Sequence, residues 1–242
     1  NTIDPSSPIF VRGDTMFIPS CLVSYEGKSL DEKTPLLRSC EALSKEGSRL
    51  LKLLGVDDTN SLTVTQNIGL EQELFFVDRD AYLNRMDLQL TGRTVVGRLG
   101  PRGQEMCDHC KCFRLVIYIY ILFYSLYVCL LCFSIDMAPI ATTSPVLACM
   151  QEIQDECFAL GIPLRTRHRE VATNQYEFAP TFGPVVTQID QNLMVMQIIE
   201  EVSKKHNLAG LMHEKPFDGV NGSGKHNNWS LCTNSGVNLF NP

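Results

Sequence analysis

The chain has 242 residues, ten cysteines and a formal net charge of −6. No basic stripe interrupts this acidic balance, which argues against general binding to nucleic acid or to an anionic membrane surface. The cysteines are scattered without the spacing of a disulfide framework, so the sequence favours a reducing compartment.

The first predicted element is a helix that begins at Thr34 as its N-cap, with Pro35 in the first helical position. Gly55 is expected to end it, because glycine commonly follows the last turn of a helix. Its apolar face is predicted from Leu36, Cys40, Leu43, Leu50 and Leu54.

Two strands are predicted next, over residues 62–64 and 70–77. Alternation along the second places Glu71 and Glu73 on one face, opposite Leu70 and Gln72. Two carboxylates on one face repel each other and are costly to desolvate unless a cation lies between them. They are therefore candidate metal ligands, the alternative being solvated surface residues.

Residues 115–135 form a nearly unbroken apolar run without a charge, long enough to span a bilayer as a helix. Four of the ten cysteines and four of the seven tyrosines lie between residues 110 and 136, so the skew belongs to this segment. Four residues just before the run resemble the ligands of a zinc cluster in type and proximity: Cys107, His109, Cys110 and Cys112.

Two more helices are predicted in the second half of the chain. The first covers residues 146–160 and is stopped by Gly161 and Pro163. The second is opened by Asp190 and has Lys204 and Lys205 near its C-terminal end. The residues expected to face inward from it are Leu193, Met196, Ile199 and Val202. The residues Met194, Met196 and Ile198 are expected in the core rather than as metal ligands.

Further candidate ligands lie around these helices. Glu170 and Glu177 flank a polar turn and can converge on one point. The loop at 221–230 reads Asn-Gly-Ser-Gly-Lys-His-Asn-Asn-Trp-Ser, and its two glycines allow backbone conformations closed to other residues and a close approach to a ligand. His226 would place a metal ligand beside exposed backbone amides.

These motifs carry a resemblance to a known family. Glu-Gln-Glu at 71–73, Glu-Val-Ala-x-x-Gln-x-Glu at 170–177 and Asn-Gly-Ser-Gly-x-His at 221–226, in that order, resemble the catalytic domain of glutamine synthetase. Segments 34–39, 90–94 and 213–226 resemble its type III branch in particular. The similarity runs from Asp4 to Pro242 with one interruption.

The resemblance implies an α+β fold in which helices back a curved antiparallel sheet. It also implies an ATP-dependent enzyme that joins ammonia to the side-chain carboxylate of glutamate through a γ-glutamyl phosphate intermediate. Paired divalent ions assist such phosphoryl transfer, and oxygen-rich ligands with one imidazole suit Mg²⁺ or Mn²⁺ better than zinc. The implied partners are glutamate, ammonia, ATP and further copies of the chain in a large double ring.

Site roles follow by position in the family pattern. Ligands of the metal ion nearer glutamate and ammonium match Glu73, Glu170 and Glu177. Ligands of the ion that holds the ATP phosphates match Glu71 and His226. Substrate-binding positions match Asn221, Gly222 and His226, and positions on the nucleotide side match Asn228 and Ser230. Type I enzymes carry a histidine where Asn228 stands.

Asp4-Pro-Ser-Ser7 resembles the Asp-Gly-Ser-Ser segment that closes the family's small N-terminal domain. There the aspartate reaches into a neighbouring subunit's site and helps to bind ammonium. The resemblance implies Asp4 and Glu170 as the catalytic residues, and an ordinary Asp-Pro turn is the alternative interpretation of Asp4.

The predicted organisation has four parts. They are the end of an N-terminal small domain at 1–13, a first part of the catalytic domain at 14–109, the apolar insertion at 110–136 and a second part at 137–242. In the family, the arginines that clamp phosphate and glutamate and another metal-binding glutamate lie downstream of the 221–226 loop. The chain is therefore expected to be a truncated fragment that is inactive alone.

A membrane-spanning helix at 115–135 would lie between two halves of one water-filled metal site, which argues against it. The family pattern expects Asp-His-Tyr directly before Met137. An intron that begins GTAAGTG after the first base of that tyrosine codon reads as Cys-Lys-Cys, the residues at 110–112. An ending ATAG followed by AC reads as Ile135-Asp136, so a translated intron is the preferred interpretation.

Two rival functions remain open at this stage. A related glutamate–amine ligase would carry the same metal and ATP motifs, and a membrane-anchored, non-catalytic relative would retain the apolar run. The expected location is the cytoplasm, or a plastid or mitochondrion if a transit peptide preceded Asn1. Neither a nucleic acid nor a genuine membrane partner is expected.

Overall fold

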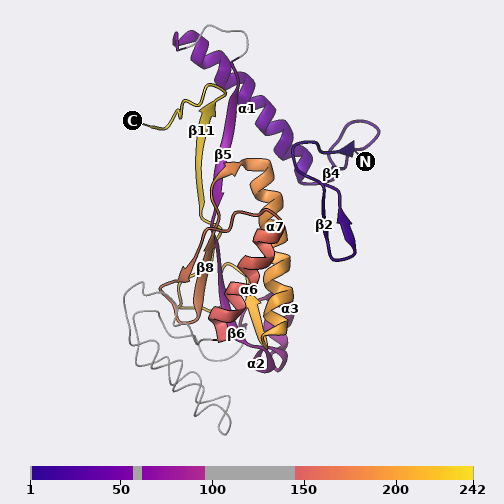
Figure 1. Cartoon of the computed structure of the whole chain (residues 1–242), viewed down its shortest axis with the longest axis vertical. Coiled ribbons are helices and arrows are strands. Elements are labelled where there is room, and N and C mark those ends of the chain that lie inside the picture. The colour runs from indigo at the N-terminus through magenta and orange to yellow at the C-terminus, as the bar shows by residue number, and fades with distance from the viewer. Residues whose placement is uncertain (1, 57–61, 96–144, 242) are drawn as a thin grey trace. The chain divides into compact units, whose positions relative to one another are not determined.

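The computed structural model describes residues 2–56, 62–95 and 145–241 (Figure 1). Every strand pair within these ranges is antiparallel. The chain divides into two compact units. The first comprises Asn1–Leu70, Thr181–Met194 and Asn227–Pro242, and the second comprises Glu71–Pro180 and Val195–His226.

The second unit is built on a four-stranded sheet in the order β10-β6-β8-β7. Its strands are β6 (Gln72–Asp78), β7 (Thr166–Arg169), β8 (Gln175–Ala179) and β10 (Leu208–Leu211). The middle of β6 is a run of three apolar residues with almost no exposed surface, Leu74, Phe75 and Phe76. Such a run indicates a strand that is covered on both faces.

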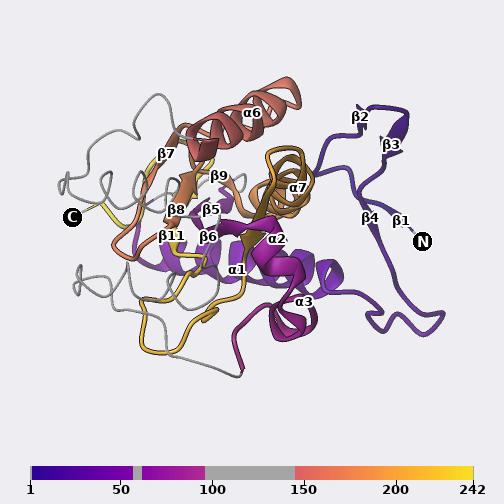
Figure 2. The same cartoon turned by 90° about the horizontal axis from the view of Figure 1, so that it is seen from below.

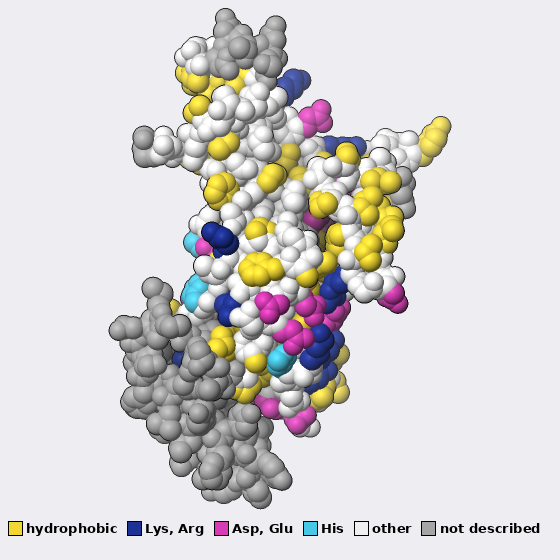
Figure 3. All heavy atoms as spheres, in the orientation of Figure 1, with side chains coloured by type: hydrophobic (Ala, Val, Ile, Leu, Met, Phe, Trp, Pro, Cys, Tyr) yellow, Lys and Arg dark blue, Asp and Glu magenta, His cyan; other side chains and the backbone are white. Residues whose placement is uncertain are grey.

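Helices lie beside this sheet (Figure 2). They are α2 (Arg79–Leu83), α3 (Met86–Thr91), α6 (Pro145–Ala159) and the C-terminal part of α7 (Val185–Lys205). Lys205 Nζ lies 2.9 Å from carboxylate oxygens of both Glu152 and Glu156, and His206 Nε2 lies 2.6 Å from Glu152. These ion pairs join the end of α7 to α6 on a face where acidic, basic and histidine side chains gather (Figure 3).

The first unit contains α1 (Lys33–Leu53) and three small sheets. Their strands are β1 (Thr2–Ile3), β2 (Phe10–Arg12), β3 (Thr15–Phe17), β4 (Ser20–Cys21), β5 (Val64–Leu70), β9 (Gly183–Pro184) and β11 (Asn227–Thr233). The larger sheet has the order β11-β5-β9, and β1 pairs with β4 and β2 with β3. Apolar side chains gather on the surface of the β2–β3 hairpin (Figure 3).

The first helix differs from its prediction in its start and in its buried face. It begins at Lys33, one residue before the predicted cap, and Asp31 rather than Thr34 accepts a hydrogen bond from the helix, at the Thr34 N–H. Leu50 and Leu54, predicted to be buried, are 54% and 67% exposed. The stripe that faces the sheet carries small side chains instead.

Those small side chains allow a close approach between α1 and β5. Ser44 Oγ accepts a hydrogen bond from the Val64 N–H at 3.2 Å, and a Cβ on Gly47 would lie 3.2 Å from the Val64 side chain. Leu51 is the buried apolar residue of this stripe and forms a cluster with Leu62 and Val64. Gly55 ends the helix with φ +70°, as predicted.

The predicted strand boundaries are wrong at β5. The strand runs over 64–70 rather than 62–64. Each of its residues, including the polar ones, is paired with a residue of β11, which is distant in sequence. Leu70 belongs to this strand, and Glu71 separates it from β6.

The later helices are closer to their predictions. The helix predicted at 146–160 is α6, one residue earlier at each end, and Gly161 follows with φ +75°. The last helix begins at Val185 rather than at Asp190, directly after Pro184. Ile199 and Val202 are buried as expected, but Leu193 is 61% exposed. Met194 and Ile198 are buried and Met196 is half-buried, which agrees with a core role.

No helix within the described ranges is long and apolar enough to cross a membrane. The apolar run at 115–135, the candidate zinc residues at 107–112 and the proposed splice junction at Met137 all lie outside those ranges.

Candidate metal-binding site

Three ionisable side chains form a row across the sheet of the second unit. Glu73 on β6 is directly opposite Glu177 on β8, and Glu177 is directly opposite His168 on β7. Residues that face each other in antiparallel strands project from the same face, with Cβ atoms about 5 Å apart. The sheet therefore brings two carboxylates and an imidazole together from three strands.

Glu170 joins this row from the end of β7. His168 Nε2 lies 2.8 Å from Glu170 Oε1 and 3.9 Å from Glu177 Oε1, and one ligand atom from each of the three residues lies within 4.8 Å of the others. In the turn between Glu170 and Glu177, Asn174 lies in the left-handed region at φ 58°. The chain reverses tightly there, so the side chains of Glu170 and Glu177 converge.

Glu71 and His226 form a second contact beside the row. His226 Nδ1 lies 3.1 Å from Glu71 Oε2, and the backbone N–H of Glu71 donates to the His226 carbonyl at 3.1 Å. The His226 side chain is 70% exposed, so it can bind a ligand from solvent.

The loop at 221–226 is hydrogen-bonded to Glu73. The Glu73 N–H donates to the Gly224 carbonyl, and the Gly224 N–H donates to Glu73 Oε2, both at 3.1 Å. Gly222 is required for space, because a Cβ there would lie 2.7 Å from the Glu214 carbonyl oxygen. Neither glycine has a positive φ, so the predicted unusual backbone conformation at 222 and 224 is wrong.

The clustered carboxyl groups perturb one another's ionisation. Burial raises the pKa of Glu177 to about 7, and the charges of Glu71, Glu170 and Glu73 add to the rise while His168 opposes it. Burial also raises the pKa of Glu73; the Gly224 N–H opposes this rise, and Glu170 and Glu71 reinforce it. Adjacent, partly desolvated carboxylates of this kind are relieved when a cation binds between them.

The donor set fits a hard divalent ion. Its atoms are carboxylate oxygens with a minority of imidazole nitrogens, a combination that favours Mg²⁺ or Mn²⁺ over zinc. The structure thus brings together all five predicted metal ligands in one unit: Glu71, Glu73, Glu170, Glu177 and His226.

The remaining predicted site residues are distributed over both units. Asn221 is exposed and lies in the same loop as Gly222 and His226. Asn228 and Ser230 lie two positions apart on β11, in the first unit, and therefore project from the same face of that strand.

Asp4, also in the first unit, is buried and ion-paired. Its Oδ2 lies 2.7 Å from Lys33 Nζ, its Oδ1 accepts hydrogen bonds from Ser6, and Lys33 in turn lies 2.5 Å from Asp190. Burial alone would raise the pKa of Asp4, but the hydrogen bonds from Lys33 and Ser6 outweigh it, and the pKa is lowered.

Two residues at the site were missed by the sequence reasoning. His168 precedes Glu170 by two positions and so shares its face of a strand, a signal that alternation in residues 166–170 contained. Gln175 is 2% exposed and hydrogen-bonds Glu73 and the loop. Gln175 is the glutamine of the Glu-Val-Ala-x-x-Gln-x-Glu motif at 170–177, but the motif alone predicted no role for it.

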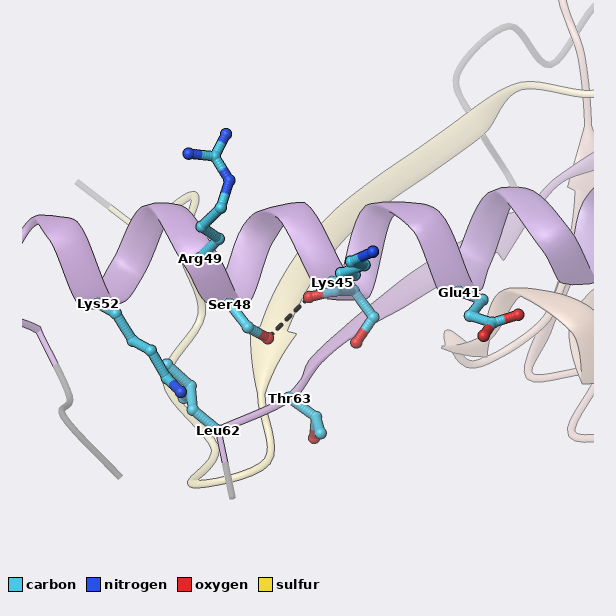
Figure 4. Close-up of a pocket in the computed structure, with 8 residues that line it drawn as sticks. Glu41, Lys45, Ser48, Arg49, Lys52, Leu62 and Thr63 are labelled. Carbon is cyan, nitrogen blue, oxygen red and sulfur yellow. Dashed lines mark hydrogen bonds between the residues drawn. The ribbon is translucent and has the colours of Figure 1, made fainter. Parts of the chain in front are cut away.

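The first unit has a groove between α1 and the start of β5, but the polar side chains that line it do not converge on one point (Figure 4). The Ser48 hydroxyl is used within the helix, donating to the Ser44 carbonyl at 2.7 Å. Arg49 points away from Thr63 and pairs with Glu46 at 2.6 Å. The carboxylate cluster is therefore the better candidate for chemistry.

Comparison with known families agrees with the geometry. The family model "Glutamine synthetase, catalytic domain" matches residues 56–242, which is more than half of the chain. The chain belongs to the glutamine synthetase family. The model "Glutamine synthetase type III N terminal" matches residues 1–39, in line with the type III resemblance of the sequence motifs.

Relatives in the family are similar over nearly the whole chain. A glutamine synthetase of Butyrivibrio fibrisolvens is 42% identical over 233 residues, 96% of this chain. A type-3 glutamine synthetase of Dictyostelium discoideum is 42% identical over 243 residues, 99% of this chain. The chain spans only 29% of the length of each of these two relatives.

Solved structures show the same fold at lower identity. Plasmodium falciparum glutamine synthetase superposes with a TM-score of 0.57 at 21% identity, over 94% of this chain and 39% of that one. A GmaS/ADP complex superposes with a TM-score of 0.53 at 16% identity, over the same shares. The predicted fold class, an α+β domain with antiparallel sheets backed by helices, is confirmed.

Proposed function

We propose that the protein to which this chain belongs ligates ammonia to the side-chain carboxylate of glutamate, at the expense of ATP and through a γ-glutamyl phosphate intermediate. The observation that carries the proposal is the convergence of Glu73, Glu170 and Glu177 on one sheet face, in a chain of the glutamine synthetase family.

The metal assignment follows from the donor atoms. Glu73, Glu170 and Glu177 would hold one Mg²⁺ or Mn²⁺ ion, and Glu71 and His226 would contribute to a second. Bound divalent ions neutralise charge on a transferring phosphoryl group. His168 holds the Glu170 carboxylate by its 2.8 Å contact and thereby limits the directions in which that carboxylate can bind an ion.

Substrate positions are proposed by the same family pattern. Asn221 and Gly222 would bind glutamate beside the carboxylates, and the two bonds between Glu73 and Gly224 fix that loop. Asn228 and Ser230 would bind the nucleotide. His226 would bind substrate as well as a metal ion, and its imidazole is exposed to solvent.

Assembly completes the proposal. A homo-oligomeric double ring would place Asp4 in a neighbouring subunit's site, where it would help to bind ammonium while Glu170 acts within its own subunit. The domain boundaries at residues 13, 109 and 136 belong to the same proposal. The proposed location is the cytoplasm, or a plastid or mitochondrion if a transit peptide precedes this chain.

The test uses the complete protein with glutamate, ATP and Mg²⁺. Release of ADP and formation of glutamine should both require ammonium, and methylamine or ethylamine should replace it poorly. Faster turnover with an alkylamine would make the protein a glutamate–amine ligase instead. ADP release that needs neither glutamate nor an amine would contradict both assignments.

A further inference from the structure

Gln175 joins three segments of the carboxylate site through one buried side chain. Its Nε2 donates to the Gly222 carbonyl at 2.7 Å and lies 3.2 Å from both Glu73 Oε2 and Ser223 Oγ. Its Oε1 accepts from the Ala172 N–H at 3.2 Å. One amide therefore contacts the strand that carries Glu73, the loop that follows Asn221 and the turn after Glu170.

The backbone of Gln175 adds to this connection. Its carbonyl accepts from the Glu170 N–H at 2.9 Å, and its N–H donates to the Ala172 carbonyl at 3.2 Å. The main chain thus closes the turn between Glu170 and Glu177, while the side chain reaches from that turn to Glu73 and the loop. A displacement of any one segment would break bonds to the others.

An amide is the chemical group that this position requires. It must donate two N–H groups toward oxygen acceptors and accept one N–H from Ala172, and glutamine does both without a charge. A methionine of similar volume would leave the buried Ala172 N–H and the partly buried Gly222 carbonyl without this partner, which is unfavourable because both groups have lost contact with water.

The donors on Glu73 are arranged asymmetrically. The Gln175 amide and the Gly224 N–H both bond Oε2, at 3.2 and 3.1 Å. Such partners fix the direction in which a ligating carboxylate presents its other oxygen. Oε1 is accordingly the oxygen of Glu73 that would bind an ion.

We infer that Gln175 is a positioning residue that fixes the 221–226 loop and the Glu73 carboxylate in the geometry that binds the divalent ion. The inference rests on the proposed function, because it assumes that the carboxylates hold an ion. It assigns Gln175 no contact with substrate.

Another buried glutamine of the second unit provides a matched control. Gln154 is 6% exposed, donates to the Leu164 carbonyl at 2.7 Å and accepts from Arg167, so it fastens α6 to the segment around β7. Gln154→Met removes a buried amide as Gln175→Met does, but it touches neither Glu73 nor the loop.

The experiment measures Mn²⁺ binding to the full-length protein by electron paramagnetic resonance, and amide hydrogen exchange in residues 221–226 without metal. In Gln175→Met the Mn²⁺ affinity should fall about 10- to 100-fold, the range found when hydrogen-bond partners of metal ligands are removed. Exchange at Ser223 and Gly224 should accelerate. Gln154→Met should lower the melting temperature while its Mn²⁺ affinity stays within threefold of wild type.

A milder variant, Gln175→Asn, tests the same role if Gln175→Met does not fold. Gln175→Asn retains the amide but shortens its reach by about 1.5 Å, the length of one carbon–carbon bond, and should show the same two effects. Mn²⁺ affinity within threefold of wild type in a folded Gln175 variant overturns the inference, as does an equal loss in Gln154→Met. A wild-type protein that binds no Mn²⁺ overturns the proposed function and this inference together.

Discussion

Glu177→Gln should stabilise the metal-free protein and weaken the binding of the metal ion, because the Glu177 carboxylate opposes folding and favours ion binding. The Glu177 side chain is 8% exposed, and its pKa is raised from 4.5 to about 7 by burial and by neighbouring carboxylates. At about 1.4 kcal/mol per pH unit, the 2.5-unit difference between 4.5 and about 7 amounts to about 3 kcal/mol. Glutamine has nearly the same shape and no charge to desolvate.

The size of this effect depends on pH. Because the folded protein binds the Glu177 proton more tightly than the unfolded chain does, the penalty is absent below about pH 4.5, grows between there and about pH 7, and is constant at higher pH. In EDTA at pH 8, Glu177→Gln should therefore raise the free energy of unfolding by up to about 3 kcal/mol, and near pH 5 by much less. Mn²⁺ at one hundred times its Kd should stabilise the wild type by about 3 kcal/mol and the variant far less.

Urea unfolding followed by circular dichroism at pH 5 and 8, with EDTA or with Mn²⁺, provides the assay. Glu214→Gln is the control, because it removes the same charge from a side chain that is 81% exposed. A Glu177→Gln protein that is less stable than wild type in EDTA at pH 8 would refute the reasoning. Equal stabilisation of both proteins by Mn²⁺ would refute the assignment of Glu177 as a ligand.

Other predictions concern binding, assembly and the transcript. The Mn²⁺ affinity of the wild type should rise about tenfold per pH unit between pH 5.5 and 6.5, because the ion must displace the Glu177 proton, and should level off above about pH 7; a flat calorimetric profile would speak against this. In the complete protein, Asp4→Ala should raise the KM for ammonium more than that for ATP or glutamate, whereas an unchanged ammonium KM would make Asp4 a turn residue. Mature mRNA should lack codons 111–135 and parts of 110 and 136, so abundant translated transcripts that keep them would exclude the intron interpretation.

Elements with strong local signals were predictable from the sequence. The α6 helix has an apolar period and is followed by Gly161, and its prediction differs by one residue at each end. The α1 helix was found by the same signals, but its buried face was not, because Ser44 and Gly47 approach β5 while several leucines remain exposed. The pattern of apolar residues does not predict a helix face that packs closely because its side chains are small.

The features that the sequence did not predict depend on pairing between strands that are far apart in the chain. The polar strand β5 exists because β11, more than 150 residues later, pairs with it. His168 and Gln175 enter the site only because β7 and β8 are paired in one register with β6. Alternation and the family motifs pointed to the glutamates, whereas the contacts that His168 and Gln175 make with them follow from the register of the sheet.

Anomalous diffraction from crystals of the full-length protein soaked in Mn²⁺ tests the central claim most directly. The account predicts a manganese peak within about 2.2 Å of carboxylate oxygens from Glu73, Glu170 and Glu177, and its loss in Glu177→Gln crystals soaked at the same concentration. A peak coordinated by other residues, or none at a concentration that supports activity, would contradict the assignment of these three carboxylates as a metal site.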